Sequence, residues 1–452
     1  MSLPTPAPDD SLQRLDRLSA LAQEVLQRCR ARGASQAEVL LNEDLGLSVG
    51  VRLGQVETLE RNRDRGLAVT VYFGQRKGNA STADLQPGSL EATVEQACAI
   101  ARHTEADPAA GLADAERMAG EVREFDAWHP WPLDPEAAIA LATEAETAGR
   151  EADPRIGNSE GANLSTGESL SVYANSHGFL GPERGSHHYL GLSLIAGQGE
   201  QMQRDYWYTS ALAPEDLEAA AAVGRRAAER AVARLSPRPL KTGEYPVLFV
   251  PEVARSLLGH LLAAASGGAL YRQASFLLGR LGERILPDWF TLSERPHLMR
   301  GLRSSSFDSE GVATAESDIV RGGVLERYLL SSYSARKLGM QSTGNAGGVT
   351  NLVASANAGG YRELLEGLGR GLVVTELMGQ GANTVTGDYS RGAAGFWVEN
   401  GAIAHPVDEV TIAGRLQDIF LAIEAVGADV DRRSPIGIGS VLVGRMTVAG
   451  QG

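Results

Sequence analysis

The sequence predicts an α+β protein with antiparallel sheets, segregated helices and a strand-rich C-terminal domain. The first observation is that helical and strand-like patterns occur in separate groups, not in βαβ alternation. The second is the glycine content. The 53 glycines among 452 residues are about 12% against a usual ~7%, without a collagen period, which favours many strands and tight turns. The third is the length, which is enough for two or three domains with their own cores.

Residues 1–125 are predicted to form an N-terminal α+β domain. Leucines recur at helical spacing over residues 11–32, and Gly33 follows as a natural stop. Four alternating apolar segments between residues 37 and 73 then indicate an antiparallel meander. A second helix is expected over residues 87–103.

Residues 126–236 are predicted to form a middle α+β domain. An Ala- and Glu-rich helix over 134–151 comes first, and an Ala-rich helix over 214–235 comes last. Ser236–Pro239 reads as a stiff linker, because proline cannot continue a helix. The strands expected between the two helices are 170–174, 178–180, 189–196 and 201–210.

Residues 237–452 are predicted to form the strand-rich C-terminal domain. A buried strand over 245–250 leads into a helix that begins at Pro251 and runs to about Ser266. Another helical piece is expected over 275–284. The text after Gly301 is rich in strands, with short helices expected near 329–338 and 361–368.

The segment Gly379–Ile403 is unusually rich in glycine, which lets backbone approach backbone or ligand closely. It contains the polar cluster Asp388, Tyr389, Ser390 and Arg391. An apolar run follows and ends in Glu399-Asn400-Gly401, a strong hairpin signal. We expect a strand–loop–strand surface with the polar cluster at an exposed tip.

Charge and cysteine content limit the classes of function. The 42 basic and 56 acidic residues give a net charge of −14, which argues against a nucleic-acid partner. The two cysteines, Cys29 and Cys98, lie in helical patterns, so we expect no disulfide framework and a reducing compartment. The Pro-rich N-terminus lacks a signal-peptide pattern, and no apolar run approaches the ~20 residues of a membrane span. The prediction is a cytoplasmic protein without membrane association.

Two short motifs suggest a serine nucleophile, but their contexts disagree. Gly157–Gly161 matches G-x-S-x-G, which requires a strand before it and a helix after it. A Pro-containing segment precedes it here, so we expect a turn. Ser334 and Lys337 match S-x-x-K, yet the K-T-G match at 241–243 precedes this pair instead of following it, so chance explains both. No H-E-x-x-H, H-x-H or C-x-x-C motif is present.

Several longer segments resemble the PmbA/TldE branch of the TldD/PmbA family. The resemblance covers nearly the whole chain and is densest over residues 245–450. The segments that carry it are 203–206, 250–254, 259–261, 266–268, 286–289, 306–311, 332–339 and 379–400.

The resemblance implies a cytoplasmic heteromeric metalloprotease made of two related chains. It implies that the TldD-type chain carries an H-E-x-x-x-H zinc motif on a helix and a cysteine ligand near its C-terminus. In the matching helix of this sequence, Arg255 replaces the first ligand and Ser256 replaces the general-base glutamate, while His260 remains. No cysteine follows Cys98. A catalytic zinc needs three protein ligands and a nearby carboxylate base, so the metal motif is degenerate.

We therefore expect a subunit that binds no cofactor alone, while zinc lies in a TldD-type catalytic partner. The expected substrates are unfolded or extended peptides, held by β-augmentation and by the substrate- or partner-binding residues Asp388 to Arg391. Arg391 would bind a carboxylate or carbonyl, unless it forms a salt bridge with Asp388 or Glu399. The isolated chain is a possible homodimer. The alternatives are an independent hydrolase with a non-metal nucleophile, and a non-enzymatic regulator of a toxin or gyrase system.

Overall fold

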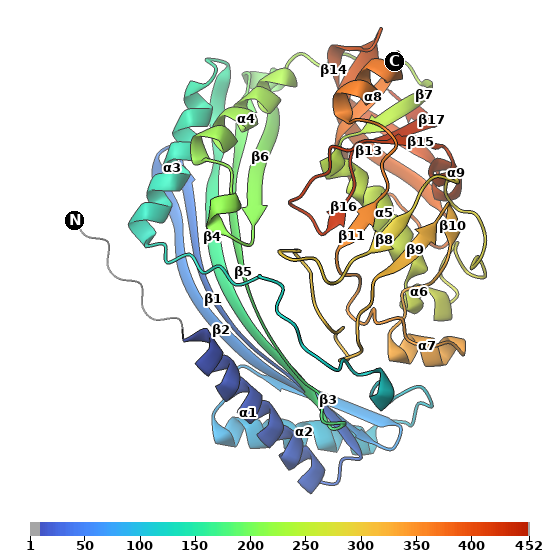
Figure 1. Cartoon of the computed structure of the whole chain (residues 1–452). Helices are drawn as coiled ribbons and strands as arrows, with labels where there is room; N and C mark the ends of the chain where they lie inside the picture. The colour runs from blue at the N-terminus through green and yellow to red at the C-terminus, as the bar shows by residue number, and fades with distance from the viewer. Residues whose placement is uncertain (1–9, 451–452) are drawn as a thin grey trace.

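A computed structural model describes residues 10–450; residues 1–9, which carry the Pro-rich N-terminus, and 451–452 lie outside the described part. A long, curved sheet forms one half of the molecule and turns its concave side toward a C-terminal half that contains two further sheets (Figure 1). Helices pack on these sheets without alternating regularly with the strands. The α+β prediction is confirmed.

The curved sheet is continuous across the two domains expected before residue 237. Residues up to 125 and residues 126–236 contribute three strands each, in the order β3-β2-β1-β4-β5-β6. Strands β1 and β4 pair from Glu38 opposite Asn175 to Val51 opposite Ala162. The three-domain division therefore stays a prediction about sequence segments. The strands are β1 Gln36–Arg52, β2 Gln55–Phe73, β3 Arg76–Thr82, β4 Ile156–Asn175, β5 Leu180–Ala196 and β6 Gln203–Ala211.

These strands are longer than the sequence suggested. The four apolar segments between residues 37 and 73 are two strands of 17 and 19 residues. The turn expected at Gly157–Gly161 is wrong, because this segment belongs to β4. Register shifts between Ile156 and Asn158 and between Ser159 and Gly161 absorb its irregularity.

Two pairs of helices cover the sheet. Helices α1 (Ser11–Ala31) and α2 (Pro87–His103) pack at one end, and α3 (Pro135–Glu151) and α4 (Ala220–Ala233) at the other (Figure 1). Three of the four predicted helices match within about one residue. Helix α4 begins later than predicted, because Pro214–Asp216 forms a separate 3₁₀ turn.

The C-terminal half has a single apolar core between its two sheets and its helices. One sheet has the strand order β14-β13-β12-β7-β17-β15, with β14 also pairing with β17, and the other has the order β10-β9-β8-β11-β16. The strands are β7 Gly243–Phe249, β8 Leu292–Glu294, β9 Ser317–Arg321, β10 Val324–Leu325, β11 Leu352–Ala354, β12 Gly371–Met378, β13 Asp388–Glu399, β14 Ala402–Arg415, β15 Ile423–Val426, β16 Ile436–Gly437 and β17 Val441–Ala449. The helices are α5 Pro251–Ala265, α6 Gly267–Tyr271, α7 Ser332–Leu338, α8 Tyr361–Leu368 and α9 Leu416–Leu421.

The helical piece predicted over 275–284 is wrong. Gly279 and Gly282 have φ values of 76° and 78°, which interrupt a right-handed helix. The Ser275 hydroxyl instead fixes a turn, because it donates to the Ala264 carbonyl and accepts from the Leu277 amide. None of the helices between residues 10 and 450 combines the length and apolar character that a membrane span requires.

Candidate functional site

Helix α5 and strand β13 bring the two predicted sets of site residues together. Val253, Leu257 and Leu261 anchor α5 in the C-terminal core. Ser256 and His260 are four residues apart, so they share another face of the helix. That face meets the beginning of β13, where the ring centroid of His260 lies 5.8 Å from that of Tyr389.

Strand geometry divides the polar cluster that the sequence predicted as one exposed tip. Residues 388–391 pair with Ile412–Arg415 of β14, so their side chains alternate between the two faces of the sheet. Tyr389 is 1% exposed and Arg391 is half-buried, whereas Asp388 and Ser390 are exposed. The exposed-tip prediction is therefore wrong for Tyr389 and Arg391. The hairpin prediction is confirmed, since Asn400 and Gly401 both have positive φ between β13 and β14.

The face shared by α5 and β13 contains polar atoms without partners. Ser256 Oγ, His260 Nε2, the Tyr389 hydroxyl and Arg391 Nε are all buried and form no hydrogen bond. Buried polar atoms are normally satisfied, because an unmade hydrogen bond costs about 1–3 kcal/mol. Four such atoms in one place make this face a candidate binding surface.

The four unpartnered groups on this face carry no negative charge. Burial, together with the Arg391 cation, lowers the pKa of His260, which favours the neutral imidazole. Burial raises the pKa of Tyr389 to about 12, so its phenol stays protonated at neutral pH. All four groups can donate a hydrogen bond, and none is a carboxylate.

Arg255 points to a different set of partners. Its guanidinium lies 3.4 Å from the Tyr208 hydroxyl and 3.7 Å from the Asp431 carboxylate. The Asp431 carboxylate is buried and also accepts from Arg433 at 2.8 Å. Arg255 is therefore part of an ion-pair network between α5 and the segment before β16.

The side chains around His260 do not fit a zinc centre. Arg255, which the sequence resemblance places at the first ligand position, is a cation, and the Arg391 charge acts on His260 itself. Cys29 and Cys98 are buried in the core formed with α1 and α2, not near α5. Within residues 10–450, no group of three His, Cys, Asp or Glu side chains is placed to hold a metal ion. One imidazole beside a guanidinium does not provide the ligand set of zinc.

A cavity of about 380 Å³ opens beside Ser256 and Arg391, between β6, α5 and β12. Its wall includes Tyr206, Trp207 and Tyr208 of β6. Trp207 is held rigidly, with Arg226 at 3.8 Å and Arg433 at 4.0 Å from its ring centre. The cavity thus combines an aromatic wall with two of the unpartnered polar groups.

The alternative role of Arg391 as a structural ion pair is not observed. Asp388 accepts a hydrogen bond from the Thr386 hydroxyl, and Glu399 accepts one from the Trp397 indole. Across the described chain, Arg391 forms no ion pair, and its Nε is buried without a partner.

Neither serine motif has the geometry of a nucleophile. Ser159 is fully buried inside β4, and its hydroxyl accepts from the Gly161 amide at 2.9 Å. Ser334 caps helix α7 together with Ser331, and the Lys337 ammonium pairs with Asp107 instead of Ser334. These contacts give both serines structural roles.

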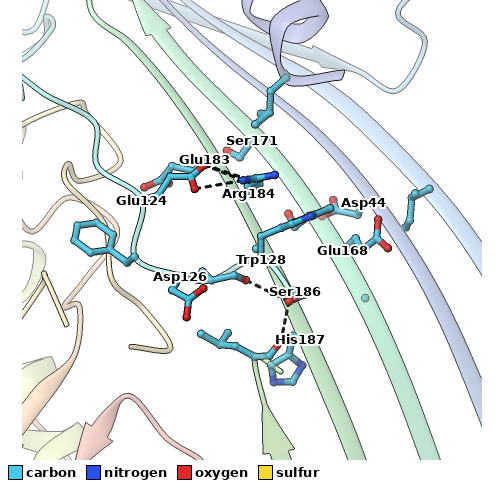
Figure 2. A pocket seen from close by; sticks show the side chains of 18 of the residues that line it. Asp44, Glu124, Asp126, Trp128, Glu168, Ser171, Glu183, Arg184, Ser186 and His187 are labelled. Carbon is cyan, nitrogen blue, oxygen red and sulfur yellow. Dashed lines mark hydrogen bonds and ion pairs between the residues drawn. The ribbon is translucent and has the colours of Figure 1, made fainter. Parts of the chain in front are cut away.

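A second cavity, of about 840 Å³, lies where residues 122–128 run along strands β4 and β5 (Figure 2). Glu124 pairs with Arg184 at 3.1 Å, and the Ser186 hydroxyl donates to the carbonyls of Ala127 and Leu212. These bonds attach the crossing segment to the sheet. The residues that line this cavity thus mainly hold residues 122–128 against strands β4 and β5.

Comparison with known proteins decides the family. Sequence models described as PmbA/TldA metallopeptidase domain 1, central domain and C-terminal domain match residues 37–101, 128–235 and 242–450. The chain belongs to the PmbA/TldD metallopeptidase family. The membership expected from the sequence is confirmed.

Individual relatives agree with this membership. The chain is 49% identical over 415 residues to the Metalloprotease PmbA of Escherichia coli O157:H7, covering 92% of each chain. A crystal structure of a Bacteroides thetaiotaomicron protein, described as a candidate modulator of DNA gyrase, matches with a TM-score of 0.92 and 29% identity over 96% of this chain and 99% of that one. TldE from Thermococcus kodakarensis shares the fold, with a TM-score of 0.85 and 20% identity over 95% and 100% of the two chains.

Sequence reasoning missed the residues that β6 and the segment before β16 add to this candidate site. Tyr208 and Arg433 are more than two hundred positions apart, yet the Arg433 guanidinium lies 4.3 Å from the Tyr208 ring centre. The only signal was the alternation of β6, which placed Tyr206 and Tyr208 on one face and Trp207 on the other. Nothing in the local sequence indicates which part of the chain meets that face.

Proposed function

We propose that this chain is the non-catalytic subunit of a cytoplasmic heteromeric metallopeptidase. In this proposal a TldD-type partner holds the zinc ion and performs hydrolysis. This chain completes the enzyme and helps to hold an unfolded or extended peptide. The observation that carries the proposal is that helix α5, which the resemblance matches to the metal-binding helix, presents Arg255 and Ser256 at the expected ligand and base positions and leaves His260 isolated.

Three further observations support this division of roles. Ser256 and Arg391, which contain two of the unpartnered buried polar atoms, line a cavity, as expected for binding without bond cleavage. Ser159 and Ser334 have structural hydrogen bonds, which disfavours an independent serine hydrolase. The net charge of −14 disfavours direct contact with DNA in a regulatory role.

Reconstitution with a TldD-type chain tests the proposal. We expect the mixture to cleave an unstructured peptide and each subunit alone to be much less active. Replacing the first zinc-binding histidine of the partner by alanine should abolish cleavage, whereas His260→Ala in this chain should retain metal-dependent hydrolysis.

Two results would contradict the proposal. One is cleavage by this chain alone that survives a chelator, which would indicate an independent hydrolase. The other is stoichiometric zinc in the purified chain, because the side chains around His260 do not supply its ligands.

A further inference from the structure

The cavity beside α5 differs from the rest of the protein in its charge balance. Three arginines and two glutamates line it, although the whole chain carries a net charge of −14. Glu376 pairs with Arg204 at 3.3 Å and with Arg234. Glu252 pairs with Arg230 at 3.4 Å and with Arg433 at 3.5 Å. Each carboxylate is thus shared by two arginines, and Arg391 is the lining cation without a carboxylate among the described residues.

The unsatisfied groups define the ligand's chemistry. Arg391 and Ser256 line the cavity, and Arg391 Nε, Ser256 Oγ, the Tyr389 hydroxyl and His260 Nε2 are buried atoms of the α5–β13 face without a hydrogen-bond partner. Arginine can only donate hydrogen bonds, and serine and protonated tyrosine can also donate. A carboxylate is acceptor-only and negatively charged, so it satisfies this set, whereas a cation would be repelled by Arg391.

The backbone hydrogen bonds of β6 favour binding of the end of a peptide over binding of an internal peptide segment. The Tyr208 carbonyl accepts from Arg433 Nη1 at 2.8 Å, and the Tyr206 amide donates to the Asp205 carboxylate at 2.7 Å. A peptide strand cannot add through positions whose backbone groups are already bonded. The cavity volume of about 380 Å³ lies near the lower end of the ~300–1,000 Å³ range of ligand pockets.

We propose that this cavity binds the free C-terminal carboxylate of an extended peptide. Arg391 forms the ion pair, Ser256 donates a hydrogen bond, and Tyr206 and Tyr208 contact the last side chain of the peptide. The inference rests on the proposed function, since it gives this subunit the task of fixing one end of the substrate. It identifies the substrate class as peptides with an unblocked C-terminus.

Binding to the isolated chain tests the proposal. The probe is a nine-residue Gly- and Ser-rich peptide that ends in leucine, has no acidic side chain and carries an N-terminal fluorophore. Fluorescence anisotropy compares its free acid with its C-terminal amide. We expect the acid to bind about tenfold more tightly, because a hydrogen-bonded charge pair would be lost with the amide.

Substitutions test which residues cause the preference for the free acid. Arg391→Gln should bring the acid down to the affinity of the amide, Arg391→Lys should retain part of the preference, and Ser256→Ala should weaken acid binding about threefold. Arg362→Gln removes the same charge from the exposed surface of α8 and should leave the preference unchanged. Chemical denaturation verifies that each variant is folded.

Three outcomes would overturn the proposal: equal affinity for acid and amide, an unchanged preference in Arg391→Gln, or no binding of either peptide up to about 1 mM. The last measurement uses a peptide that is amidated at its C-terminus and has one internal glutamate. If it binds as tightly as the free acid, the cavity recognises side-chain carboxylates and not chain ends. If the free acid shows no preference over the amide while cleavage with the partner is intact, this inference alone is rejected. Cleavage by this chain that resists a chelator would instead reject the proposed function.

Discussion

The guanidinium of Arg255 lies 3.7 Å from the carboxylate of Asp431, which joins helix α5 to the segment before β16. Asp431 is buried and also binds Arg433, so one carboxylate neutralises two cations. We predict that Asp431→Ala lowers the free energy of unfolding by about 3 kcal/mol, because it removes a buried anion, leaves Arg255 without a carboxylate and leaves Arg433 with only its pair to Glu252 at 3.5 Å. Urea denaturation measures this difference.

Two controls separate this network from an ordinary surface pair. Arg255→Ala should cost about 1 kcal/mol, since Arg433 still pairs with Asp431. Asp288→Ala removes an exposed pair with Arg284 and should change stability by less than about 1 kcal/mol. Equal losses in Asp431→Ala and Asp288→Ala would show that the network is not stabilising.

Asp308 predicts a pH-dependent stability. Burial raises its pKa to about 6, although the amides of Ala346, Glu310 and Val312 donate to its carboxylate. The folded chain therefore binds a proton that the unfolded chain has already released above its ordinary pKa of ~3.9. We expect the free energy of unfolding attributable to this group to fall between about pH 4 and pH 6 and to level off above pH 6.

Asp308→Asn tests this assignment, because asparagine does not titrate. Denaturation curves at several pH values should show a smaller decrease between about pH 4 and pH 6 in the variant than in the parent chain. The variant should also be less stable above pH 6, where the ionised carboxylate accepts from the Ala346 amide and the asparagine NH2 group would face that donor. Identical slopes would mean that Asp308 does not carry the dependence.

Cys29 and Cys98 should be chemically silent in the folded protein. Both are 0% exposed, and burial raises the pKa of Cys29 to about 12 and also raises that of Cys98. The thiolate is the reactive form, so a thiol reagent should modify neither residue until the protein is denatured. Ser390→Cys places a thiol on an exposed strand position and should react at once. Rapid modification of the parent chain would indicate that the N-terminal core opens readily.

The β13–β14 turn predicts a position-specific glycine effect. Gly401 has a φ of 74°, and a Cβ atom there would lie 2.7 Å from the Glu366 carbonyl. Gly401→Ala should therefore lower the free energy of unfolding by about 2 kcal/mol. Gly367→Ala, in helix α8 with no atom near the new Cβ, should be neutral or stabilising by up to ~1 kcal/mol. Thermal denaturation of both variants makes the comparison.

Sequence patterns correctly predicted the helices whose ends are determined by neighbouring residues. Helices α2 and α8 match their predicted bounds because proline, glycine and apolar spacing mark them in the sequence. The piece over 275–284 was mispredicted because an apolar pattern does not report a backbone turn fixed by Ser275. Strand lengths were underestimated for a similar reason: residues 61–65 of β2 are exposed and polar, and pairing with β1 keeps them extended.

The candidate site was predicted in part. The degenerate motif on α5 and the cluster on β13 were both identified, and the structure brings His260, Tyr389 and Arg391 together. The exposed tip was wrong, because pairing with β14 fixes which side chains of β13 face inward. The contribution of Arg433 depends on tertiary contacts between distant segments, which periodicity does not encode.

The pairing of β1 with β4 has a consequence for synthesis of the chain. Glu38 finds its partner in Asn175, so more than a hundred residues must be added before this ladder can close. Until then the β1 edge of the newly made β1–β2 hairpin has unpaired backbone groups. Other strands can pair with this edge in place of β4. The six-stranded sheet therefore cannot form until β4 has been synthesised.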